Sequence, residues 1–174
     1  MANYRKTIDE MNALGLRATT IDVDWWAESS EIFAPIQAWE AAGLHAGYFH
    51  RIEPAIRERL EWGASLSPGE IANLRKRHAG FRARMDELFA RYELILLPAA
   101  PVACLQAGAD HSHTRKRLLR YTTPFSLAGA PAVTIPCSAG GMQMAAAREA
   151  DEPLLQIAAL IGARRKLSAP VLNA

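Results

Sequence analysis

The sequence predicts an α/β fold, a mixed β-sheet flanked by helices, and three observations carry this prediction. Half of the 174 residues are hydrophobic, which is enough to build a core. Short apolar runs at 94–97 and 132–137 are typical of buried strands, whereas longer segments place apolar residues at helical spacing. Strands separated by helices favour an α/β architecture, and a glycine pair at 140–141 suits a hairpin that makes one strand pair antiparallel. We therefore expect a single α/β domain over residues 1–166 and a loose tail at 167–174.

The first third of the chain is predicted to hold two helices around one strand. Apolar residues at helical spacing over 4–14, with Gly15 placed as a C-cap, predict the first helix. Residues 17–25 alternate apolar and polar side chains, which predicts a strand. The second helix is expected from residue 29 or 30 to about residue 48, with an interruption near Gly43.

The clearest local signal follows a shorter predicted helix over 54–62, which Gly63 ends. Ser67-Pro68-Gly69-Glu70 combines a capping serine, a proline at the first helical position and a glutamate that completes a capping box. The helix that begins there carries an apolar seam with steps of three and four, which predicts that one stripe packs against a core. The seam consists of Ile71, Leu74, His78, Phe81, Met85, Leu88 and Tyr92.

The remaining residues are predicted to alternate short strands with a loop and helices. A buried strand at 94–97 is followed by a long loop at 99–119. A short helix at 125–128 comes next, which Thr123-Pro124 opens and Gly129 closes. The chain then forms a strand at 132–137, a Gly140-Gly141 hairpin turn into 142–147, and an amphipathic helix from Asp151 through Ile161. Long loops in compact domains are often functional, so the segment 99–119 is of interest for a site.

Charge and composition argue against several classes of function. The 20 basic and 18 acidic side chains leave a formal net charge of +2, so no global field draws the chain to nucleic acid or to a membrane. The longest apolar runs are far shorter than the roughly 20 residues of a membrane-spanning helix. Two separated cysteines and the lack of a secretory segment at the start favour a reduced, cytoplasmic setting.

The sequence contains no strong catalytic or metal-binding motif. There is no Gly-x-Ser-x-Gly elbow, no phosphate-binding Gly-rich loop and no His-Glu-x-x-His pair. His111 and His113 would share one face of a strand, but two histidines are too few for a metal site, and solvated loop histidines are the favoured interpretation. Cys137 closes an apolar strand and is expected to be buried and inert, whereas Cys104 lies on the loop and could be exposed. We expect no metal, no cofactor and no catalytic cysteine.

Two further features leave alternatives open. Arg115, Lys116, Arg117 and Arg120 could meet a phosphate or an acidic partner. A solvated, mobile loop is the favoured interpretation, because four charges without interleaved aromatic residues are a weak signal for nucleic acid. The tryptophan pair at 25–26 marks either an interface or packing behind a strand.

Several segments, in order along the chain, resemble segments of the amidase signature hydrolases. The strongest is 123–137 (TPFSLAGAPAVTIPC), similar to the family segment in which a short capped helix turns into a central strand. Segments 59–63 (RLEWG), 89–98 (FARYELILLP) and 151–155 (DEPLL) also resemble family segments. The resemblance runs through nearly the whole chain and implies a fold like the C-terminal half of the amidase signature fold.

The chain also departs from the family pattern. Glu93, Ala99 and Ser126 stand where the family usually has aspartate, threonine and asparagine. The stretch 138–144 is shorter than the family's turn before the next strand, so the resemblance implies a hairpin that is clipped or altered in register.

The resemblance implies that the chain lacks the chemistry of the family. Family members hydrolyse amide bonds with a Lys-Ser-Ser machinery, and no segment here matches it, so no catalytic residue is carried over and the chain alone is expected to be inactive. In the resembled fold the C-terminal half lies across from the nucleophile. Pro98, Thr122, Thr123 and Ser126 are therefore the candidate residues of a substrate-pocket wall, with helix capping an equal or better interpretation for the two threonines.

A partial sheet exposes strand edges that pair with other chains unless they are covered. The expected partner is a separately encoded N-terminal amidase half or a second copy of the chain, with a small amide substrate only in the assembled enzyme. Neither nucleic acid nor a membrane is an expected partner. Two interpretations of the function remain open. The chain is either a part of an amidase-like hydrolase or a non-enzymatic binding or assembly module derived from an amidase.

Overall fold

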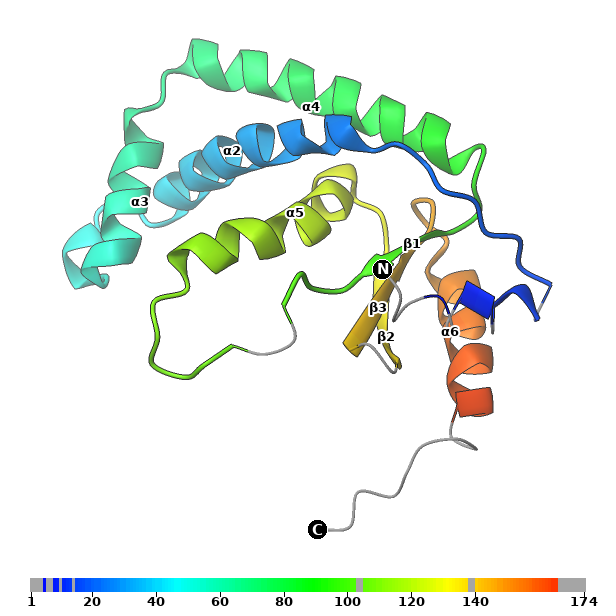
Figure 1. The fold of residues 1–174 in the computed structure, drawn as a ribbon. Coiled ribbons are helices and arrows are strands. Elements are labelled where there is room, and N and C mark those ends of the chain that lie inside the picture. Colours follow the sequence, from blue (N-terminus) through cyan, green and yellow to red (C-terminus); the bar gives the residue numbers. More distant parts are fainter. Residues whose placement is uncertain are drawn as a thin grey trace.

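A three-stranded sheet lies between the C-terminal helix and a group of four helices in the computed structural model of the chain (Figure 1). The structure describes residues 5, 8–9, 11–13, 15–102, 105–137 and 140–165. The elements, with η for a 3-10 helix, are η1 (Asp24–Ala27), α2 (Glu28–Leu44), η2 (Phe49–Arg51), α3 (Pro54–Ser65), α4 (Pro68–Phe89), β1 (Ile95–Pro98), α5 (Ser112–Ala128), β2 (Ala132–Cys137), β3 (Gly140–Ala145) and α6 (Asp151–Arg165). The α/β class that the sequence predicts is confirmed.

Helix α4 begins at the predicted capping box. The backbone N–H of Glu70 donates to Ser67 Oγ at 3.2 Å, and the backbone N–H of Ser67 donates to the Glu70 carboxylate at 2.8 Å. The Ser67 hydroxyl also donates to this carboxylate at 2.7 Å. The hydroxyl and then the backbone N–H lower the pKa of Glu70 from its ordinary value of 4.5, because both stabilise the ionised form.

The predicted seam of α4 faces the interior. Its buried members are Ile71, Phe81, Met85 and Leu88. The basic residues between them point outward, and Arg84 lies over the Trp25 ring with 4.1 Å between its guanidinium carbon and the ring centroid. The stripe therefore buries one side of a 22-residue helix and leaves the other to solvent.

Helices α2 and α3 form a close-packed pair through Gly63. The sequence predicts that Gly63 ends its helix, but α3 continues to Ser65 and Gly63 is buried inside it. A Cβ atom at this position would lie 2.1 Å from the Ala38 carbonyl oxygen and 2.9 Å from the Trp39 backbone nitrogen on α2. The glycine is thus required by the approach of two backbones and not by a left-handed C-cap. The other predicted helix is confirmed as α2, although it ends at Leu44.

Strand β3 is the middle of the sheet and pairs antiparallel with both neighbours. The sequence predicts a mixed sheet, but the described strands form an antiparallel one. Strands β1 and β2 run in the same direction without pairing, so no parallel ladder occurs among the described strands. The predicted Gly140-Gly141 turn is also wrong, since the register pairs Cys137 with Gly140 and Pro136 with Gly141. The residues between these two strands, 138–139, lie outside the described residues.

Gly141 has a packing role in the strand. A Cβ there would come within 2.9 Å of both Ala99 Cβ and Thr134 Cγ2, so a glycine is what lets β2 and the segment after β1 approach β3. The backbone N–H of Ala99 donates to the Gly141 carbonyl at 2.8 Å and extends the β1 ladder by one residue.

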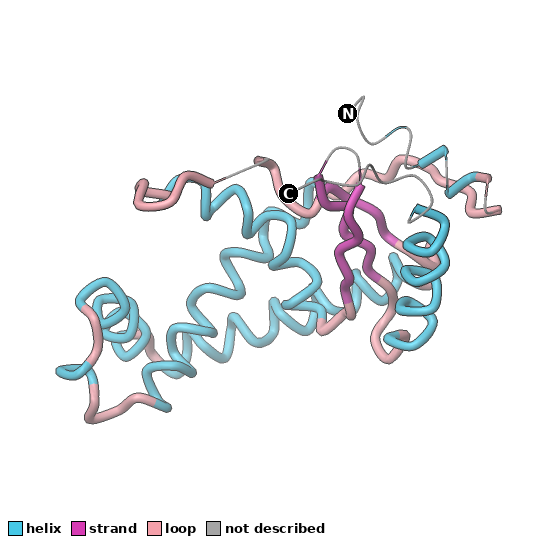
Figure 2. The backbone as a smooth tube through the Cα atoms, turned by 90° about the horizontal axis from the view of Figure 1, so that it is seen from below, coloured by secondary structure: helices cyan, strands magenta, loops and turns pink. Residues whose placement is uncertain are grey.

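Two hydrophobic clusters lie on the two sides of the sheet, in agreement with the placement of α6 opposite the other helices in Figures 1 and 2. The cluster on the side of α2, α4 and α5 contains Trp26, Ile32, Phe81, Met85, Leu88, Ile95, Phe125, Leu127, Ala128 and Ala145. The cluster on the α6 side contains Met11, Ile135, Met142, Met144, Ala146, Leu154, Ala158 and Ile161. Side chains alternate along β3, so Met142 and Met144 face α6 while Gln143 and Ala145 face the other helices.

The predicted strand over 17–25 is wrong. Residues 16–23 form neither helix nor strand, and Trp25 and Trp26 belong to η1. In a strand, neighbouring side chains would point to opposite faces. In the structure both rings reach one core, with Trp25 at 5.1 Å from Phe81 and Trp26 at 5.2 Å from Phe125 between ring centroids. Of the two interpretations of the tryptophan pair, interior packing is the one the structure supports.

The predicted long loop at 99–119 and the predicted helix start at Thr123-Pro124 are also wrong in part. Helix α5 begins at Ser112, so it takes in the second half of the loop, and Pro124 lies in the helix interior. Its stripe is formed by Leu118, Tyr121, Phe125 and Ala128. This stripe has the helical steps of three and four that could have revealed the helix in the sequence.

The two ends of the chain are only partly described. Arg5, Ile8, Asp9, Met11 and Asn12 are helical, as predicted for 4–14, and the intervening residues lie outside the described ones. The predicted tail at 167–174 lies outside them entirely. Among the described residues, no helix has both the length and the apolar composition that a bilayer crossing requires.

Candidate functional site

Helix α5 carries three of the four predicted pocket residues, and its C-terminal half is held firmly. The Nε2–H of His78 on α4 donates to the Leu127 carbonyl at 2.6 Å, the assignment following from the fact that a carbonyl only accepts. The Trp26 ring meets Phe125 edge-on. Gly129 ends the helix at φ +70°, a left-handed conformation that glycine adopts without strain. The orientation of α5 is thereby fixed against the interior.

The three α5 residues are divided between surface and core. Thr122 and Ser126 are exposed and four residues apart, which places them on one face of the helix. Thr123 is buried, with 3% of its surface exposed. The alternative that both threonines cap a helix is wrong, because α5 begins at Ser112. The structure thus brings Thr122 and Ser126 together and separates Thr123 from them.

Pro98 lies apart from this pair, at the end of β1. It is half-buried and pairs in register with Met142, whose side chain belongs to the α6 side of the sheet. Because side chains alternate along a strand, Pro98 lies on the face of the sheet opposite to that of Gln143. The next residue, Ala99, lies against Gly141, which is on the same face as Gln143. The described contacts therefore link Ala99, more directly than Pro98, to the α5 side.

Gln143 joins the sheet to α5 and is a residue that the sequence reasoning missed. It is 6% exposed, and its Nε2 donates to the Tyr121 carbonyl at 2.9 Å. Pro124 has no N–H, so the helix loses the hydrogen bond that residue 124 would have given to the Arg120 carbonyl. The amide of Gln143 meets the next carbonyl along the helix. An amide side chain between two buried methionines in a strand is the sequence signal that could have pointed to it.

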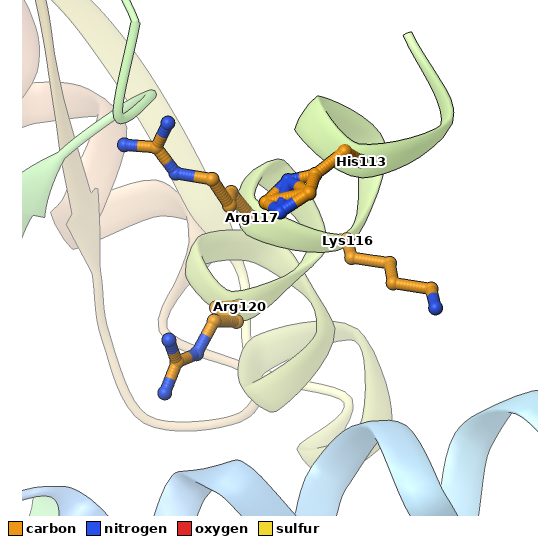
Figure 3. A pocket seen from close by; sticks show the side chains of 4 residues that line it. All are labelled: His113, Lys116, Arg117 and Arg120. Atoms are coloured by element: carbon orange, nitrogen blue, oxygen red, sulfur yellow. The ribbon is translucent and has the colours of Figure 1, made fainter.

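The basic residues of α5 lie around a shallow cavity of about 390 Å³. It is lined by His113, Lys116, Arg117 and Arg120 (Figure 3). All four side chains are exposed. The sequence favours a mobile, solvated loop here, and the structure replaces it with a regular helix.

In the described part of the chain, no group of three or more His, Cys, Asp or Glu side chains could hold a metal ion. His111 and His113 do not lie on a strand, the condition under which they would share one face: His111 is the N-cap position of α5, with its Nε2 donating to the Gln106 carbonyl at 2.7 Å, and His113 lies in the helix. Cys104 and the side chain of Cys137 lie outside the described residues, so their predicted states stay predictions.

Sequence comparison relates the chain to one kind of enzyme. No family model matches. One component of the glutamyl-tRNA(Gln) amidotransferase of Neisseria meningitidis serogroup C is 47% identical over 58 residues, which cover 32% of this chain and 12% of the relative. The corresponding polypeptide of Lachnospira eligens is 33% identical over 110 residues, 56% of this chain and 23% of the relative. The chain thus matches less than a quarter of the length of these curated relatives.

Solved structures extend the similarity to nearly the whole fold. A crystal structure of an amidase superposes with a TM-score of 0.82 at 20% identity, covering 94% of this chain and 41% of the amidase. An inhibitor-bound vestigial protein complex connected with the origins of an s-triazine catabolic enzyme gives a TM-score of 0.74 at 19% identity, covering 99% of this chain and 41% of the other. At these identities the superpositions establish the fold alone. Together with the sequence matches, they relate this chain to the amidase signature family over a region that resembles the C-terminal part of those enzymes.

Proposed function

We propose that this chain supplies the C-terminal, non-catalytic part of an amidase-like hydrolase that cleaves carbon–nitrogen amide bonds. The observation that carries the proposal is the superposition in which 94% of this chain accounts for 41% of an amidase. The Lys-Ser-Ser machinery of the family has no counterpart in the sequence. The chain is therefore inactive alone and works with a polypeptide that carries those residues.

The open sides of the sheet support a partner. No further described strand pairs with β1 or β2, which lie at the two edges. On the side of β2 that faces away from α6, Ala132, Thr134 and Pro136 are exposed. Exposed strand edges and faces are places where another chain adds strands or packs. The partner is a separately encoded N-terminal amidase half, and the domain that receives it extends over residues 1–166.

In the assembled enzyme, the chain provides one wall of the substrate pocket. Thr122 and Ser126 present two hydroxyl groups on one exposed face of α5, which suits hydrogen bonding to a small amide. Thr123 supports this face from the buried side, and Pro98, which ends β1 apart from the two hydroxyl groups, is the fourth residue that we assign to the wall.

Reconstitution tests the proposal. The purified chain is assayed for ammonia release from simple amides, alone and with a catalytic amidase half expressed separately. We expect no hydrolysis from either part and hydrolysis from the mixture, with a reduced kcat/KM in the Thr122→Ala/Ser126→Ala variant. Ser65→Ala, at an exposed position on α3, is the matched control and keeps full activity. Hydrolysis by the chain alone contradicts the proposal.

A non-enzymatic binding or assembly module is the second candidate, and one surface favours it. At the α2–α3 end, Leu44 is 84%, Tyr48 57% and Ile56 52% exposed. Apolar side chains gathered at one end of a molecule often mark a contact with another protein. A stable homo-oligomer that forms without a catalytic half, and in which these side chains are protected, favours this candidate.

A further inference from the structure

The four residues of α5 that line the cavity lie within an arc of about 100° around the helix axis, with Lys116 at one edge and Arg117 at the other. Positions 113, 116, 117 and 120 are spaced by three, one and three residues, the spacing of neighbours on a helical surface. Arg115, in the middle of the same run, points to a different side of the helix by this spacing. In Figure 3, Arg117 and Arg120 project to the same side of α5, while Lys116 extends to the other side. The Cα atoms of these two arginines are about 4.5 Å apart along the helix axis, so rotation of the two long, exposed side chains can bring both guanidinium groups to one anion.

The four lining residues lack the acidic partners that some of the other described arginines have. Arg77, Arg84 and Arg148 each pair with a carboxylate at 2.7–3.0 Å. In the described part of the chain, the four lining residues form no ion pair, and the first turn of α5 contains no acidic residue.

The local electrostatics of α5 are therefore unfavourable in isolation. Positive side chains repel one another, and the positive end of the helix dipole lies close to them. An anion in the cavity would relieve both effects at once. The molecule places its cations without carboxylates around a cavity of about 390 Å³ that solvent can enter.

We propose that this cavity is a binding site for a small, multiply charged oxyanion, with Arg117 and Arg120 as its principal donors and His113 and Lys116 at its rim. Arginine suits this chemistry because its planar fork donates two hydrogen bonds to one carboxylate or phosphate. The four positions span only about 10 Å of the helix axis. A polynucleotide typically engages many more phosphates over a longer surface, so a small ligand with carboxylate or phosphate groups fits better.

The proposal is independent of the amidase assignment, because it concerns binding and requires no hydrolysis. The chain is titrated with inorganic phosphate and with citrate at constant ionic strength, and the backbone amide resonances of residues 113–120 are followed by NMR. We expect saturable shifts concentrated on these residues. In Arg117→Gln/Arg120→Gln the dissociation constant should rise at least roughly tenfold, because two charge-assisted hydrogen bonds are lost.

The matched control is Arg115→Gln/Lys76→Gln, which removes the same charge from another side of α5 and from exposed α4 and should bind as the parent does. Because removing like charges relieves repulsion, we expect the test variant to fold; if it does not, Arg117→Gln and Arg120→Gln are measured singly and should each weaken binding. Equal affinities in test and control variants, or shifts that sodium chloride reproduces, overturn the proposal. Tighter binding of a single-stranded oligonucleotide that also depends on Arg115 and Lys76 overturns it in favour of a nucleic-acid surface. Phosphate binding without citrate binding, or the reverse, identifies the ligand's anionic group within the proposed class.

Discussion

Replacement of Gly63 by alanine should destabilise the chain even though alanine is the better helix former. The new Cβ would lie 2.1 Å from the Ala38 carbonyl oxygen, about 0.9 Å short of the 3.0 Å that real Cβ contacts respect. The obstructing atoms are backbone, so no side chain can rotate away and α2 must separate from α3. Overpacking of this kind costs about 1–3 kcal/mol or more, against a helix-propensity gain of about 1 kcal/mol. We expect a net loss of about 2 kcal/mol, since a displacement of whole helices lies at the upper end of that range.

The measurement is urea unfolding followed by circular dichroism. With a slope near 2 kcal/mol per molar urea, the Gly63→Ala midpoint should fall by about 1 M. The control is Gly80→Ala on α4, where a Cβ meets no atom within 4 Å and where the substitution should stabilise by about 0.5–1 kcal/mol. If Gly63→Ala and Gly80→Ala are stabilised alike, the conclusion that the backbones of α2 and α3 approach closely at Gly63 is wrong.

Three further predictions concern the capping box and the link between sheet and helix. Ser67→Ala should cost about 1 kcal/mol of unfolding free energy, because α4 loses its N-cap; an unchanged urea midpoint would contradict the capping box. The pKa of Glu70 is lowered by folding, so its ionised form stabilises the protein at neutral pH and this contribution is lost as the pH falls through the folded pKa, below 4.5. The stability difference between the parent and Glu70→Gln should accordingly shrink in acid, and a difference that grows there would show the opposite linkage. Gln143→Leu should cost about 1 kcal/mol, because the part-buried carbonyl of Tyr121 loses this donor; an unfolding temperature equal to that of the parent would show that the bond contributes little.

The parts of the fold that the sequence predicts correctly are those with local causes. The capping box at Ser67 and the seam that includes Phe81 determine α4 without help from the rest of the chain. The strand at 132–137 is confirmed because its apolar run is short and bounded by turn residues. By contrast, Trp25 and Trp26 leave the predicted strand because two distant rings, on α4 and α5, bind them in one core. No local pattern contains that information.

The candidate site is likewise predicted only in part, because contacts between distant segments decide which of its residues meet. Thr122 and Ser126 are predicted by resemblance, and the structure places both on one exposed face; their role in a pocket stays a prediction. Gln143 and Ala99 escape prediction because their importance depends on which elements meet across the sheet. The basic run is predicted as a loop because charged residues obscure a helical period that only Leu118 marks clearly in that stretch.

Pro124 divides α5 into two parts with different tasks. After it, Phe125, Leu127 and Ala128 are buried and hold the helix against α2 and α4. Before it, the basic face is exposed and has no acidic partner among the described residues. A helix end that carries only cations is costly by itself, so the buried half must supply the stability that keeps the exposed half helical. Loss of Gln143, which bonds to the carbonyl of Tyr121 at this boundary, should therefore loosen the basic half before it loosens the core.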